Sequence, residues 1–350
     1  MGFLRDCIID VMKKDRNNVS TVLKMIGLDG GEGSGNFGHK GRPGMVGGSG
    51  EGGGSGSAKE KREQHLPLFG GLEKKGIRIK EIKEPQRPNA DDYGGYTEEY
   101  YKAREAYKTE REEYKKKVHE WIDEQIPKEP ISRDDLDKWA QNNNVKIGNI
   151  DELDMRLAKA WSERYEKLIE AFPEVNDYFR VKGEAYNTEK QPTLNVDASK
   201  SYLAYANNGM TFCGYSAKDM ELFCMYQFEN VSDNTTVEGD GTVNTVFDHE
   251  FGHNLFDYIR NKVGYYPPDD YSKLTPAEMM IDKKKADEYH KKRVEIESDF
   301  MQNVFGKSGC SQYSYRNMDE AAAEGFAAWN GGEETEFAKA FGEFLWRWID

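Results

Sequence analysis

Apolar residues recur at intervals of three and four through the middle of the chain, which predicts a helical layer in residues 96–192. The first of these helices begins near Thr97 and carries one apolar stripe. The stripe is expected to pack in the core, and a coiled-coil interface is the alternative. The stripe consists of Tyr100, Ala103, Tyr107, Tyr114, Val118 and Trp121. Ser132 and Asp135 resemble a capping box that opens a short helix, and a longer helix follows until Pro173.

Strand patterns are confined to residues 193–350. Residues 202–206 and 210–213 are rich in aromatic and other apolar side chains and flank Asn207-Asn208-Gly209. An Asn-Gly pair accepts the positive φ angles of a tight turn, so this segment predicts a hairpin. Residues 221–226 are a further strand candidate. The combination predicts an α+β fold in which helices precede a small sheet.

The first 95 residues differ in composition from the rest. Residues 1–28 predict one amphipathic helix, which needs a partner because a single helix cannot bury its own apolar face. Its apolar positions include Leu4, Ile8, Val11, Val19, Val22, Leu23 and Ile26. Residues 29–95 are dominated by Gly, Ser and polar residues and predict a disordered, flexible linker. Residues 33–38 match G-x-G-x-x-G, but no strand precedes and no helix follows, so a dinucleotide site is not expected.

Composition narrows the classes of partner. A net charge of −14 argues against a nucleic acid held through phosphate contacts. The four cysteines are widely spaced without a C-x-x-C pair, which favours a reduced, cytoplasmic setting. The N-terminal residues lack the apolar core of a signal peptide, and no run approaches the roughly 20 apolar residues of a membrane span. We therefore expect neither a nucleic-acid nor a membrane partner.

Residues 249–253 spell His-Glu-Phe-Gly-His, the H-E-x-x-H pattern of zinc hydrolases. On a helix this spacing places His249 and His253 one turn apart on the same face, where neutral imidazoles can bind one Zn²⁺. Thr242 is the expected N-cap of that helix. Glu250 is then the general base, and Asp257, one turn after His253, is expected to orient that imidazole from outside the coordination sphere.

The third ligand is expected from a later carboxylate. Metzincins have Gly and His at two fixed positions after the motif, but Phe256 and Ile259 occupy them here, which excludes that class. Glu278 and Glu320 both remain candidates. Glu320 is favoured because the residues after it are small and allow close packing on the motif helix, whereas Glu278 follows Thr275-Pro276 at a predicted helix start, where acids are common as caps.

Residues 249–258, followed after a long insert by residues 313–324, resemble the catalytic domains of the anthrax lethal factor family in the gluzincin clan. The resemblance covers about 242–326, with its elements in the same order and at compatible spacing. It implies a mixed sheet with the active-site helix beneath it. One departure is that Ala321 and Ala322 replace the bulky residues usual after the ligand glutamate.

The same resemblance implies roles for individual residues. Three are implied as ligands of one zinc per chain: His249, His253 and Glu320. Glu250 is implied as the base and Tyr313 as the donor that stabilises the oxyanion, with Tyr315 as the near alternative. Glu324 is implied to support the metal ligands from outside the coordination sphere.

A second resemblance concerns residues 35–49, Gly-Asn-Phe-Gly-His-Lys-Gly-Arg-Pro-Gly-Met-Val-Gly-Gly-Ser. This run is similar to a segment of phage and prophage head-associated proteins, where it precedes variable C-terminal domains. It implies a minor-head setting in which the helix of residues 1–28 binds head or portal proteins, in the host cytoplasm or in the virion. An ordinary flexible linker is the alternative.

The sequence therefore predicts a zinc-dependent endopeptidase that acts on a peptide or protein substrate, bound as an added strand at the edge of the sheet. A virion structural protein that keeps the zincin fold with little or no turnover is the alternative from another class. A third possibility is an enzyme that cuts its own Gly-rich segment.

Overall fold

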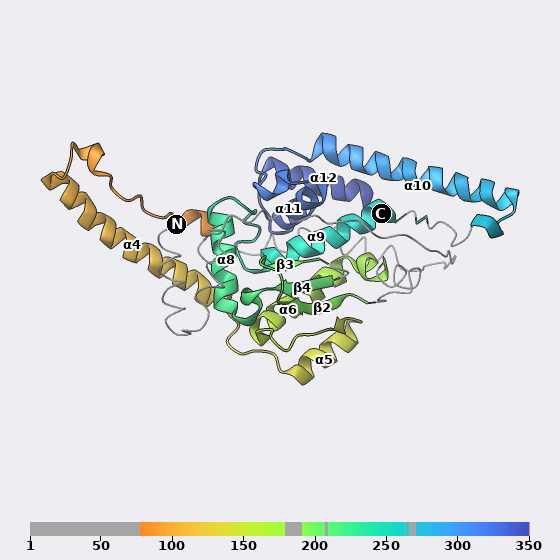
Figure 1. Ribbon diagram of the computed structural model, residues 1–350, viewed down its shortest axis with the longest axis horizontal. Helices are drawn as coiled ribbons and strands as arrows, with labels where there is room; N and C mark the ends of the chain where they lie inside the picture. Colours follow the sequence, from red (N-terminus) through yellow and green to blue (C-terminus); the bar gives the residue numbers. More distant parts are fainter. Residues whose placement is uncertain (1–77, 179–190, 207–208, 263, 266–270, 350) are drawn as a thin grey trace. The chain divides into compact units, whose positions relative to one another are not determined.

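The computed structural model describes residues 78–178, 191–206, 209–262, 264, 265 and 271–349 (Figure 1). The predicted helix of residues 1–28 and the phage-like segment 35–49 lie outside these ranges. In chain order the helical elements are η1 (Ile79–Glu81), η2 (Ala90–Tyr93), α4 (Glu98–Gln125), α5 (Arg133–Asn142), α6 (Met155–Ala171), η3 (Tyr215–Lys218), α8 (Met220–Ser232), α9 (Asn244–Asn261), η4 (Tyr271–Lys273), α10 (Pro276–Asn303), η5 (Tyr313–Tyr315), α11 (Met318–Asn330) and α12 (Glu336–Trp348). The strands are β1 (Lys146–Ile147), β2 (Thr193–Asp197), β3 (Ala204–Tyr205) and β4 (Gly209–Cys213), so the predicted α+β class is confirmed.

The prediction of a flexible linker over residues 29–95 is wrong for its C-terminal end. Residues 78–95 contain η1 and η2, and the side chains of Ile79 and Ile82 are almost fully buried, with η1 packed on α8. The guanidinium of Arg78 donates to the carbonyl of Gly239 at 3.1 Å. Two isoleucines in a polar segment produce no periodic pattern, which is why the sequence did not reveal this packing.

The predicted helices of the middle region are confirmed. The Thr97 side chain caps α4 by accepting from the backbone N–H of Tyr100 at 3.3 Å. The C-terminal half of the apolar stripe of α4 packs on α8, where the rings of Trp121 and Phe228 lie 5.6 Å apart, whereas Tyr100 near the start of α4 contacts Tyr93 and Tyr96. The C-terminal half of the stripe therefore belongs to the core of the described part of the chain, while Ala103 and Tyr107 are only half-buried. Ser132 caps α5, and α6 ends at Ala171, two residues before Pro173.

The sheet has the strand order β1-β2-β4-β3, with β1, β2 and β4 parallel and β3 antiparallel to β4. Strands β3 and β4 confirm the two arms of the predicted hairpin, whose turn residues 207 and 208 lie outside the described ranges. The first strand was predicted after Pro192, but β1 lies earlier, within the predicted helical layer. A two-residue strand shows no alternation, and its pairing with β2 joins the predicted regions 96–192 and 193–350 in one sheet.

The strand predicted at residues 221–226 is wrong, because this run lies in α8. A short apolar run is compatible with a strand or with a buried helix, and the local cap decides between them. Here the Asp219 carboxylate accepts from the backbone N–H groups of Glu221 at 2.9 Å and Leu222 at 3.2 Å. These bonds satisfy the free donors of a helix start.

Helices α9 and α11 pack closely in the core (Figure 1). A Cβ placed on Gly252 would lie 2.9 Å from the Cα of Ala323, a distance that real Cβ atoms do not show. Around this crossing the rings of Phe251 and Phe326 lie 5.7 Å apart, and Phe172 beyond α6 lies 5.7 Å from Phe326. The absence of a side chain at position 252 therefore permits the two helix backbones to touch.

A buried ion pair joins α6 to the same helix. Arg164 donates to the Asp248 carboxylate through Nε at 2.7 Å, and its Nη2 also lies 3.1 Å from Asp240. Asn330, at the end of α11, donates to Asp248 at 3.1 Å. Breaking a buried pair on one side leaves an uncompensated charge, so these contacts strongly favour a single placement of α9.

We predict that Ile79→Ala lowers the free energy of unfolding of the full chain by about 2–4 kcal/mol, because Ile79 is buried and its loss leaves a cavity. Ile281→Ala is the matched control, since Ile281 is 58% exposed and its truncation should stay within about 0.5 kcal/mol. Urea unfolding monitored by circular dichroism measures both. Equal stability of the two variants would place residues 78–95 outside the core.

Candidate metal centre

Helix α9 carries the two predicted histidine ligands. The helix begins at Asn244, two residues after Thr242, whose hydroxyl accepts from the Asn244 backbone N–H at 3.1 Å. Val243 holds the N-cap position, so the predicted cap is displaced by one residue, within the usual uncertainty of a helix end. The helical spacing brings the Nε2 atoms of His249 and His253 to 3.2 Å from each other.

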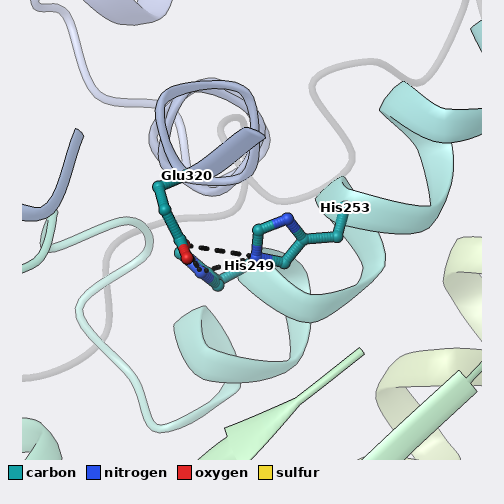
Figure 2. Close-up of side chains that lie close together, drawn as sticks. All are labelled: His249, His253 and Glu320. Atoms are coloured by element: carbon teal, nitrogen blue, oxygen red, sulfur yellow. Dashed lines mark hydrogen bonds and ion pairs between the residues drawn. The ribbon is translucent and has the colours of Figure 1, made fainter. Parts of the chain in front are cut away.

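Glu320 completes a triangle of ligand atoms with the two imidazoles (Figure 2). Its Oε2 lies 3.3 Å from Nε2 of His249 and 3.3 Å from Nε2 of His253. Three ligand atoms at the corners of a tetrahedron, each roughly 2.0–2.1 Å from a zinc ion, are about 3.3 Å apart. The triangle therefore fits one tetrahedral zinc and leaves the fourth corner open.

The position of Glu320 follows from the start of α11. Asn317 caps this helix by accepting from the Glu320 backbone N–H at 2.9 Å, and the side chain of Glu320 then points from the first turn toward α9. Burial by itself raises the pKa of Glu320, but the two adjacent imidazoles outweigh it, and the pKa lies well below its ordinary value. Glu320 is therefore an anionic oxygen donor at neutral pH.

The alternative ligand Glu278 has a different role. It lies in the first turn of α10, is exposed, and forms a capping box with Thr275. Its Oε2 accepts from the backbone N–H and the hydroxyl of Thr275, both at 2.7 Å. Among the described residues, the His249, His253 and Glu320 cluster has the geometry of a metal site, and Glu278 is not part of it.

Glu324 supports His249 from outside the triangle. Its Oε1 accepts from Nδ1 of His249 at 2.8 Å, while its Oε2 accepts from the Ser311 hydroxyl at 2.6 Å and the Val237 backbone N–H at 2.7 Å. A donor contact at Nδ1 leaves Nε2 as the free lone pair for a metal. Burial by itself lowers the pKa of His249, but the carboxylates of Glu320 and Glu324 raise it well above its ordinary value.

The sequence revealed Glu324 but neither Ser311 nor the backbone of Val237. A backbone donor has no signature in a sequence, and Ser311 lies in a polar loop with no motif around it. The only sequence signal was indirect: a buried carboxylate at position 324 needs partners for both oxygens. Those partners come from two loops that the chain folds together over a long separation.

Asp257 lies one turn after His253 on α9, as predicted. Its Oδ2 accepts from the Tyr178 hydroxyl at 2.9 Å, and its Oδ1 accepts from the Asn261 side chain at 2.8 Å. These bonds fix the carboxylate at the C-terminal side of His253. Its role in orienting that imidazole stays a prediction.

Glu250 is part of α9, and its side chain faces the end of the edge strand β3. It is buried, its carboxylate accepts from the backbone of Ala206 just after β3, and its Oε2 has no hydrogen-bond partner among the described residues. Burial raises the pKa of Glu250 above its ordinary value, although the charges of His249 and His253 oppose this. A carboxylate with one free buried oxygen and a raised pKa is suited to accept a proton.

Tyr313 lies beside the triangle, and its ring centroid is 5.8 Å from that of His249. Burial raises the pKa of Tyr313 to about 12, so its hydroxyl keeps its proton and can donate a hydrogen bond. Tyr315, the alternative, is 58% exposed and packs against Phe305 at 6.1 Å. Of the two tyrosines, Tyr313 is therefore the one that the structure places against a predicted ligand.

Comparison with known proteins adds no family to this geometry, since no family model, curated protein or solved structure matches the chain. No helix in the described ranges is both long and apolar enough to cross a membrane. The chemical interpretation of the centre therefore depends on its own residues.

We predict that Glu320→Ala weakens zinc binding by roughly 100-fold or more, because the variant loses a direct ligand. Loss of a residue that only hydrogen-bonds to a ligand costs about 10–100-fold in metal affinity. Glu278→Ala is the matched control and should leave the affinity unchanged, because Glu278 only caps α10. Competition titrations of the metal-depleted proteins with a zinc-binding dye measure both affinities. A larger loss in Glu278→Ala than in Glu320→Ala would contradict this ligand assignment.

Proposed function

We propose that the protein is a zinc-dependent endopeptidase of the gluzincin type, with a zincin-like catalytic domain similar to that of the lethal factor family. The observation that carries the proposal is the triangle of His249, His253 and Glu320 with Glu250 beside it. Two imidazoles and one carboxylate around an open corner are the donor set of hydrolytic zinc sites, whereas structural sites use four protein ligands. We expect one zinc per chain, because this is the one such cluster among the described residues.

Zinc in such a site lowers the pKa of a bound water to about 7 and polarises the carbonyl of the scissile peptide. Glu250 takes a proton from the attacking water and passes it to the leaving amine nitrogen. Its free Oε2 and the burial that raises the pKa of Glu250 support both steps. The amine that leaves is thereby protonated as the peptide bond breaks.

Tyr313 donates its hydroxyl proton in a hydrogen bond to the oxyanion that forms on the carbonyl. The burial that raises the pKa of Tyr313 keeps this donor protonated at neutral pH. The guanidinium of Arg316 lies 4.1 Å from the centre of the Tyr313 ring, where a cation is attracted to the ring face. A donor held between this guanidinium and His249 needs little reorganisation during the reaction.

The substrate is an extended peptide that pairs with β3. This strand is at the edge of the described sheet, and Ala206 immediately after it already contacts Glu250. Strand addition uses backbone hydrogen bonds, so it brings peptides of many sequences to the same register beside the base.

The setting of this activity is proposed from residues 35–49, which resemble a segment of phage head-associated proteins. On this proposal the enzyme is phage- or prophage-encoded, and the helix predicted from the sequence for residues 1–28 attaches it to head or portal proteins. The enzyme then acts in the host cytoplasm or travels with the virion.

We predict that Glu250→Gln abolishes hydrolysis of a casein substrate while zinc content stays near one ion per chain. The amide fills the volume of the carboxylate but cannot accept the proton of the attacking water. Casein cleavage and metal analysis of the same preparation measure both effects. Residual activity equal to that of the parent would remove Glu250 from the mechanism, and joint loss of zinc and activity would make it structural.

We predict that Tyr313→Phe lowers kcat by about 100-fold, the effect of removing one oxyanion donor, with little change in KM. Tyr315→Phe is the matched control, because that hydroxyl belongs to an exposed side chain. Steady-state kinetics on one cleaved peptide separate the two variants. A loss confined to Tyr315→Phe would reverse the assignment of the two tyrosines.

A further inference from the structure

An open groove lies between the C-terminal part of α10 and the segment that leads into α11. Its volume is about 510 Å³, within the roughly 300–1,000 Å³ range of ligand pockets. Its apolar lining consists of Val294, Met301, Phe305, Tyr315 and Met318. Of these, Val294 is 60% exposed and Met301 46% exposed. The groove thus brings several large apolar side chains together at the surface.

The groove adjoins the metal centre through Arg316, which is part of its lining. The Arg316 guanidinium lies 4.1 Å from the centre of the Tyr313 ring, and that ring lies 5.8 Å from the ring of His249. Arg316 is therefore at most about 10 Å from His249, a distance that an extended peptide covers in about three residues. A peptide cleaved at the centre is long enough to reach the groove.

The two charged residues that line the groove, Glu297 and Arg316, differ in their ion pairs. Glu297 is paired with Arg293 at 2.8 Å and lies 3.8 Å from Arg260. Arg316 is exposed and forms no ion pair with a carboxylate within the described ranges. One face of its guanidinium lies over Tyr313, which leaves the N–H groups at its edge available to a carboxylate.

We propose that this groove is a specificity subsite for the peptide substrate, about three residues from the scissile bond. It takes a large apolar side chain, and Arg316 binds an acidic side chain next to it. Met301 and Met318 are unbranched and adaptable, so the groove accepts Leu, Met or Phe without strong preference among them. The inference rests on the proposed peptidase function and adds a substrate preference to it.

The test is a cleavage-site profile of the full-length zinc-loaded protein on a peptide library made by digesting a bacterial proteome, with the products identified by mass spectrometry. We expect enrichment of large apolar residues at one position two to four residues from the cleaved bond, with Asp or Glu at its neighbour. Met301→Asp should remove the apolar enrichment, and Arg316→Glu should replace the acidic preference by a basic one. Each should lower kcat/KM on the best parental peptide by about ten-fold or more.

Met280→Asp is the matched control, because Met280 is 74% exposed on α10 but does not line the groove. It should leave the profile unchanged, and zinc content and circular dichroism should match the parent in all three variants. Cleavage with no positional preference, or a profile that Met301→Asp and Arg316→Glu leave unaltered, would overturn the subsite alone. No cleavage by the zinc-loaded parent would overturn the peptidase function and the subsite with it.

Discussion

The close approach of α9 to α11 is the constraint on which the candidate metal centre depends. Gly252 lies within the motif, directly before His253. A side chain at this position would collide with the backbone of Ala323. Since Glu320 lies one turn before Ala323, any displacement of α11 would move its carboxylate out of 3.3 Å contact with the imidazoles. The small residues after Glu320, which depart from the lethal-factor pattern, are fully buried at this helix and have the size that this packing requires.

Electrostatics in the centre favour a bound cation. Glu250, Glu320 and Glu324 are all buried around two imidazoles, and burying carboxylates without compensation is costly. The carboxylates of Glu320 and Glu324 raise the pKa of His249, and the neighbouring imidazoles lower that of Glu320, so a proton on His249 supplies part of the compensation. A zinc ion needs the same nitrogen lone pairs, so protons and metal compete for one site. Two nitrogen donors and one oxygen donor match the preference of zinc.

The candidate site could be predicted further from the sequence than the fold around it. Helical spacing alone brings His249 and His253 together, and the small residues after Glu320 indicated the helix that packs on them. Local patterns failed where long-range pairing decides the structure. The strand β1 exists only through its pairing with β2, and residues 78–95 are held by long-range contacts, which include the burial of two isoleucines and the hydrogen bond from Arg78 to Gly239. The run 221–226 fits a strand as well as a helix until its Asp219 cap is taken into account.

The groove and the metal centre are built on one packed frame. The Phe300 ring of α10 lies 5.1 Å from that of Phe256 on α9, which fixes the helix that forms one wall of the groove. Next to the groove residue Met318, Arg260 of α9 forms an ion pair with Asp319 at 2.7 Å, immediately before the proposed ligand Glu320. The same helix α9 therefore places the imidazoles, braces α10 and holds the start of α11. If the groove binds the substrate as proposed, the packing of α9 sets the distances between the groove side chains and the candidate metal centre, so one helix positions both substrate recognition and catalysis.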